Sequence, residues 1–165
     1  RTLRKAYLVP FEAAVREAKV LSVMTGYNRL NGTYCSENAW LLKNVLRDEW
    51  GFNGLVMSDW FGTHSSLPCL SAGLDLEMPG WRGMFYGDQL TKLIKEGKAP
   101  IDLLRERARN VLCVMAKLGL LDDEREEDTP QASPNTESQK SLLRRAAAES
   151  VVLLKNEDGV LPLSR

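Results

Sequence analysis

Two residue types that build many catalytic and metal sites are nearly missing from this sequence. It has one histidine, His64, and three widely spaced cysteines, Cys35, Cys69 and Cys113. A single histidine with no nucleophile pattern around it argues against a histidine-based catalytic dyad. The cysteines show no metal-ligand spacing, and their odd number specifies no disulfide framework. We therefore expect neither a metal site nor a cofactor.

The sequence also lacks an excess of charge and a long hydrophobic run. Its 22 basic and 22 acidic residues cancel, so no global field favours nucleic acid or an anionic membrane surface as a partner. No apolar run approaches the roughly 20 residues that span a bilayer. The first residues, 1–5, do not resemble a signal peptide, and for a fragment this leaves the compartment open. The sequence does not indicate an oligomeric state either.

The most informative stretch is 54–61, where a short apolar run ends in polar residues. Leu55 to Met57 is typical of a strand that is buried on both faces, and Ser58, Asp59 and Trp60 follow it directly. In parallel α/β folds, catalytic residues lie at such strand ends. A carboxylate beside an indole suits sugar cleavage, although Asp59 could instead cap the next helix or open a turn.

The stretch 54–61 contains one of five motifs that occur in a fixed order along the chain. They are MTGYNRLNG (24–32), SEN (36–38), VLRDEWGF (45–52), MSDW (57–60) and AGLDLEMPG (72–80). In this order and spacing the chain resembles glycoside hydrolase family 3, most closely its fungal β-glucosidases. The resemblance covers nearly the whole chain and is weakest in 121–136.

The resemblance implies roles for four residues. Asp59 matches the catalytic nucleophile of a retaining β-glycosidase, and Tyr27 matches a tyrosine that lies close to it and to the bound sugar. Trp60 resembles the aromatic wall of the leaving-group subsite, and Met24 would line the same pocket. The alternative for Tyr27, Trp60 and Met24 is ordinary packing.

A second carboxylate is not assigned within this sequence. Asp75 and Glu77 lie at another expected strand end, but the resemblance implies that the general acid/base comes from beyond Arg165. We expect Glu77 to be a structural carboxylate near the barrel mouth. The Lys-His pair, the Asp and the Arg that grip the sugar in this family would lie upstream.

The expected fold class is α/β, the C-terminal part of a TIM-type α/β barrel followed by the start of a second α/β sandwich domain. A complete barrel typically needs about 250 residues, more than the 165 here. The barrel portion is expected over 1–120, a charged linker over 121–136 and the second domain over 137–165. Periodicity and breakers predict strands at 20–24, 55–57, 74–78 and 151–155, and helices at 2–18, 36–50, 64–72, 88–96, 101–119 and from 138. The stretch 25–32, rich in Gly and Asn, is expected to be a loop. Pro10 is expected to bend or divide the first helix.

The sequence thus predicts a fragment of a β-glucosidase that hydrolyses terminal non-reducing β-D-glucosyl residues by double displacement. Its partner would be a β-glucoside or cello-oligosaccharide, with no role for nucleic acid or membrane. Subsite shape decides the sugar, so a β-xylosidase of the same family is an alternative. A catalytically inert truncated product is another, and the isolated 165 residues are expected to be inactive.

Overall fold

The computed structural model describes residues 1–121 and 135–163. It divides into two units, Arg1–Asp123 and Glu124–Arg165. The division falls inside the expected linker 121–136, most of which lies outside the described residues. The assignment of 137–165 to a second domain stays a prediction.

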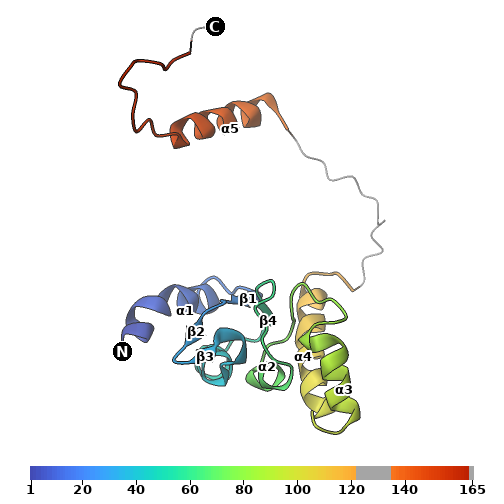
Figure 1. Cartoon of the computed structure of the whole chain (residues 1–165). Coiled ribbons are helices and arrows are strands. Elements are labelled where there is room, and N and C mark those ends of the chain that lie inside the picture. The colour runs from blue at the N-terminus through green and yellow to red at the C-terminus, as the bar shows by residue number, and fades with distance from the viewer. Residues whose placement is uncertain (122–134, 164–165) are drawn as a thin grey trace. The chain divides into compact units, whose positions relative to one another are not determined.

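The first unit is built around parallel strands. Strands β1 (Ser22–Thr25) and β4 (Leu55–Ser58) lie side by side (Figure 1). They pair in parallel, with Met24 opposite Met57 and Thr25 opposite Ser58. On the other side of β4, Leu76 forms a single parallel bridge to Met57, so the strand expected at 74–78 is reduced to one bridged residue. The order β1, β4 and then the segment 74–78 is the one expected of consecutive βαβ units.

Helices connect these strands and supply the buried core. The helices of this unit are η1 (Leu3–Tyr7), α1 (Val9–Arg16), η2 (Cys35–Glu37), η3 (Trp40–Glu49), α2 (Leu67–Ala72), η4 (Phe85–Gln89), α3 (Leu90–Lys95) and α4 (Ile101–Lys117). The break between η1 and α1 at Leu8 confirms the division expected near Pro10. Helix η3 joins β1 to β4, and its apolar face buries Leu42, Val45 and Leu46 against the side of the sheet that carries Val56.

Two further expectations about the local structure of this unit are wrong. The segment 25–32 was expected to be a loop, but strands β2 (Arg29–Leu30) and β3 (Thr33–Tyr34) form an antiparallel hairpin around Asn31-Gly32. Both turn residues have positive φ, 52° and 91°, which Asn-Gly adopts readily in a two-residue hairpin turn. The helix expected from Ser36 begins at Trp40 instead, where the Asn38 side chain accepts a hydrogen bond from the Leu41 N–H.

The second unit contains helix α5 (Glu137–Ser150), which begins close to the expected residue 138. Thr136 and Gln139 form a reciprocal capping box at its start. The strand expected at 151–155 is not formed: this segment is exposed and has no strand partner among the described residues. An apolar β-rich sequence becomes a strand only when another strand satisfies its backbone.

Candidate active site

The site begins where β4 ends, at a buried serine. The Ser58 N–H donates to the Leu76 carbonyl at 2.9 Å, and its hydroxyl accepts a hydrogen bond from the Met78 N–H at 2.9 Å. Three residues after Ser58, the Phe61 N–H donates to the Met78 carbonyl at 3.0 Å. These bonds attach the loop that carries Asp59 to the segment 74–78.

Asp59 follows β4 directly and is partly exposed. Its Oδ1 accepts the Trp60 N–H at 2.7 Å, and its carbonyl accepts the Gly62 N–H at 2.9 Å. Asp59 therefore opens a turn, which is one of the two structural roles that the sequence left open for it. It does not cap the next helix, because α2 begins at Leu67 after Ser66. A turn at the strand end leaves the carboxylate accessible from solvent.

Tyr27 comes from the loop after β1 and reaches the same turn. Its hydroxyl donates to the Trp60 carbonyl at 2.8 Å. The neighbouring Asp59 carboxylate is the main cause that raises the pKa of Tyr27 above its ordinary value, with desolvation adding to the rise. The two neighbouring parallel strands thus bring Tyr27, Asp59 and Trp60 together, although Tyr27 and Asp59 are far apart in the sequence.

The structure does not place Met24 in a common cavity with those three residues. Met24 lines an apolar cavity of about 530 Å³ between β1 and the helices η1, α1 and η3. Among the described residues that line this cavity, Tyr27, Asp59 and Trp60 are absent. The role of Met24 in substrate binding stays a prediction.

Two aromatic residues beside Trp60 were not singled out from the sequence. The rings of Trp60 and Phe61 meet edge to face with centroids 6.3 Å apart, and those of Phe61 and Trp81 do so at 5.6 Å. Trp81 belongs to the loop after the segment 74–78. Trp81 directly follows Pro79-Gly80, at the end of the expected strand 74–78. This position could have identified Trp81 as a site residue from the sequence, because the carboxyl ends of parallel strands share one edge of the sheet.

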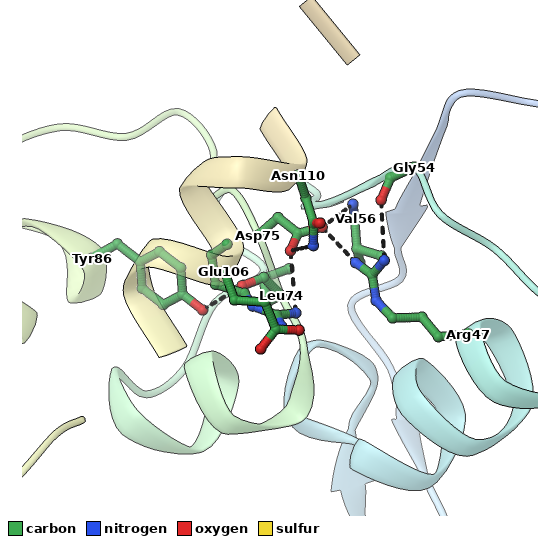
Figure 2. Close-up of polar contacts among 9 residues, drawn as sticks. Arg47, Gly54, Val56, Leu74, Asp75, Tyr86, Glu106 and Asn110 are labelled. Carbon is green, nitrogen blue, oxygen red and sulfur yellow. Dashed lines mark hydrogen bonds and ion pairs between the residues drawn. The ribbon is translucent and has the colours of Figure 1, made fainter. Parts of the chain in front are cut away.

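Asp75 lies at the centre of a buried polar network (Figure 2). Its Oδ2 accepts hydrogen bonds from Arg47 at 2.6 Å and from the Val56 N–H at 2.7 Å. Its Oδ1 accepts one from Asn110 at 2.8 Å and is 3.2 Å from Nη1 of Arg107. Burial raises the pKa of the Asp75 carboxyl, and the donors around it oppose that rise. Asp75 thus joins η3, β4 and α4, which is a structural role.

Glu77 is also occupied by internal contacts. It is buried and accepts the Tyr86 N–H at 2.6 Å and the Phe85 N–H at 3.3 Å, at the start of η4. A carboxylate at a helix N-terminus is stabilised by the free N–H groups there. These contacts agree with the interpretation of Glu77 as a structural carboxylate.

Two kinds of feature are absent from the part of the chain that the structure describes. No cluster of three or more His, Cys, Asp or Glu side chains there could hold a metal ion. None of the helices over 1–121 and 135–163 is long and apolar enough to cross a bilayer.

Comparison with known proteins connects this geometry to a family. Residues 1–114 match the model of the glycosyl hydrolase family 3 N-terminal domain. The whole chain is 50% identical to a β-glucosidase of Rhizobium radiobacter and 48% identical to probable β-glucosidase I of Aspergillus clavatus. It covers 20% and 19% of those two proteins, so it spans about a fifth of the relatives it matches.

A solved structure of a β-glucosidase is also similar to this chain. The crystal structure of a β-glucosidase from Kluyveromyces marxianus in complex with glucose aligns with a TM-score of 0.72 and 38% identity, over 99% of this chain and 20% of that one. Such structural neighbours have a TIM barrel as their N-terminal domain, which confirms the predicted α/β-barrel fold class.

Proposed function

The chain belongs to glycosyl hydrolase family 3, and on that premise we propose that it carries the nucleophile of a retaining β-glucosidase. The full-length protein would hydrolyse terminal non-reducing β-D-glucosyl residues. The observation that carries this proposal is the Tyr27–Asp59–Trp60 arrangement at the carboxyl ends of β1 and β4. The relatives' names support the reaction, and the accessible carboxylate at a strand end supports the assignment to Asp59.

The reaction has two displacement steps. In the first, a carboxylate oxygen of Asp59 forms a bond to the anomeric carbon while the bond from that carbon to the leaving-group oxygen breaks. A general acid gives a proton to the departing oxygen. In the second, a water deprotonated by the same group attacks the glycosyl ester, which frees Asp59 and retains the β configuration.

Asp75 and Glu77 are poor candidates for that general acid. Both side chains are buried, and both are engaged by Arg47 or by backbone N–H donors. A proton donor must instead reach the leaving-group oxygen. The proposal therefore assigns the acid/base to a residue of the full-length protein outside this chain.

Tyr27 and Trp60 support the nucleophile in different ways. The Tyr27 hydroxyl binds the Trp60 carbonyl and lies beside Asp59, so it limits the orientations that the turn and its carboxylate adopt. The Trp60 ring offers an apolar face to the leaving group, where stacking is worth about 1 kcal/mol.

Covalent labelling tests the proposal directly. A 2-deoxy-2-fluoro-β-D-glucoside with a good leaving group should inactivate the full-length enzyme, because the fluorine slows hydrolysis of the glycosyl ester. Mass spectrometry of a digest should place the sugar on the peptide that contains Asp59. A label on Asp75 or Glu77 would contradict the assignment, and faster labelling by the matching xyloside would favour a β-xylosidase.

A further inference from the structure

A buried serine holds the end of the turn that carries Asp59. Ser36 belongs to η2, and its side chain is fully buried. The Ser36 hydroxyl donates a hydrogen bond to the Gly62 carbonyl at 2.8 Å, across 26 residues of the sequence. Because residues of this chain alone bury Ser36 completely, the contact does not depend on the rest of a longer protein.

Gly62 connects this hydrogen bond to the nucleophile. The Gly62 N–H closes the turn on the Asp59 carbonyl at 2.9 Å. A Cβ at Gly62 would lie 3.2 Å from that carbonyl oxygen and 3.5 Å from the Asp59 Cβ, so the two residues pack closely. Glycine has more backbone freedom than any other residue, and a bond that fixes its carbonyl removes that freedom from the turn. The Ser36 hydroxyl thus fixes the residue against which the backbone of Asp59 packs.

The surroundings of Ser36 leave the Gly62 carbonyl as the strong acceptor for its hydroxyl. Cys69 of α2 is fully buried, and burial raises the pKa of its thiol. The hydroxyls of Ser65 and Ser36 are among the groups that oppose this rise, which places Ser36 beside the thiol. A neutral thiol is a weak acceptor, whereas a backbone carbonyl is a strong one. The Ser36 hydroxyl is therefore directed to Gly62.

The segment that contains Ser36 makes a second contact with the same loop. Tyr34 of β3 stacks on His64, two residues after Gly62, with ring centroids 3.7 Å apart and 23° between the ring planes. A loop that is attached at two nearby points has fewer conformations than one attached at a single point. The residues that follow Asp59 are thus held in place before any sugar binds.

We propose that Ser36 is a positioning residue for the nucleophile: through Gly62 it sets the distance and direction from which the Asp59 carboxylate meets the anomeric carbon. This proposal rests on the proposed β-glucosidase function. Bond formation depends steeply on such geometry, because a misplacement of about 1 Å can cost on the order of 100-fold in rate. Loss of the hydroxyl therefore slows the first displacement step and has little effect on sugar binding.

The test measures how fast Asp59 is labelled in the full-length enzyme. For Ser36→Ala, the rate constant for inactivation by a saturating 2-deoxy-2-fluoro-β-D-glucoside should fall about five- to fiftyfold, while the inhibition constant for glucose should change by less than about twofold. Ser66→Ala is the matched control, because the buried Ser66 hydroxyl donates to the Phe85 carbonyl at 2.7 Å. Both variants lose one bond from a serine to a carbonyl and should lose similar stability. Ser66→Ala should keep the wild-type labelling rate.

Equal labelling rates for Ser36→Ala and Ser66→Ala would overturn the positioning role, and so would a loss of glucose affinity as large as the loss of rate. The proposed function would stand in both cases, provided that the wild type carries the label on Asp59. A wild type without that label would contradict the proposed function, and the role of Ser36 with it.

A second variant gives the answer if Ser36→Ala does not fold. Gly62→Ala keeps the Ser36 hydroxyl but places a Cβ against the Asp59 carbonyl. It should also slow the labelling of Asp59 without weakening inhibition by glucose. A wild-type labelling rate in Gly62→Ala would show that Gly62 does not position the nucleophile, and would overturn the proposal.

Discussion

At the scale of single residues, the position of Asp59 depends on one turn. The Trp60 N–H holds one carboxylate oxygen, and the Gly62 N–H bonds the Asp59 carbonyl. Tyr27 bonds the next carbonyl in the same turn. The carboxylate is therefore oriented by short backbone bonds, and these bonds survive a change of the carboxylate to an amide.

Replacing Asp59 by asparagine should abolish most turnover in the full-length enzyme. Asparagine can still accept the Trp60 N–H, but an amide does not form the glycosyl ester. We expect kcat to fall by about a thousandfold or more, as is typical when a nucleophile is removed. The unfolding midpoint of Asp59→Asn serves as the folding control. A variant that keeps a tenth of wild-type turnover would exclude Asp59 as the nucleophile.

Replacing Tyr27 by phenylalanine should have a smaller effect. It removes the hydroxyl that bonds the Trp60 carbonyl and lies beside Asp59. The loss of one such hydrogen bond predicts a fall in kcat of about five- to tenfold. Tyr7→Phe provides a matched control, because Tyr7 is an exposed tyrosine of η1. Equal rates for the two variants would argue that Tyr27 is only a packing residue.

At the scale of secondary-structure elements, one carboxylate connects three of them. Asp75 binds Arg47 of η3, the backbone of β4, and Arg107 and Asn110 of α4. Gly73 ends α2 with φ 108°, and a Cβ there would lie 3.3 Å from the Arg107 guanidinium. Glycine thus permits both the left-handed helix end and the close approach of the arginine that meets Asp75.

Removing Asp75 should destabilise the fold far more than removing an exposed partner does. The side chain of Asp75 is 0% exposed and that of Arg107 is 2% exposed. Asp75→Ala leaves the buried Arg107 guanidinium with only its pair to the exposed Glu106. Loss of the buried carboxylate partner costs about 3–5 kcal/mol of unfolding free energy. Urea unfolding of the full-length protein measures this change.

The matched control for that measurement is Asp102→Ala. Asp102 pairs with Arg105 at 2.9 Å on the surface of α4. Exposed pairs contribute about 0–1 kcal/mol, so this variant should unfold close to the wild type. Similar stability losses for the two variants would show that the buried network contributes no more than a surface pair.

At the scale of the whole chain, each unit has apolar surface without a partner. In the first unit, Met24 and the cavity beside β1 are open. In the second unit, Leu143, Val151 and Leu154 are more than half exposed. Apolar surface of this extent in an isolated chain favours association with other apolar surfaces.

Residues 1–165 expressed alone should therefore be inactive and prone to aggregate. A nucleophile without a positioned acid lacks a contribution of about 10²–10⁴-fold to the rate. Hydrolysis of an aryl β-glucoside should be undetectable, and binding of a hydrophobic dye should be strong. Activity that Asp59→Asn abolishes would show that these residues contain a complete site, including an acid.

The sequence by itself determined the family resemblance, the strand that ends at Asp59 and most of the helices. These features depend on local patterns: an apolar run, a 3.6-residue period, and glycine or proline at element ends. The Asn31-Gly32 hairpin is equally local, and its turn signal was present but was interpreted as a loop. The strand at 151–155 shows the limit of such patterns, because a strand also requires a partner.

Only the tertiary structure decided which distant side chains meet. Tyr27 reaches the Trp60 carbonyl across 33 residues, and Asn110 reaches Asp75 across 35. Phe61 and Trp81 come together because the parallel segments β4 and 74–78 end at the same edge. Whether Asp75 is catalytic or structural depends on burial and on the donors that packing brings to it. Local composition does not specify such contacts, since they follow from how the helices and strands pack.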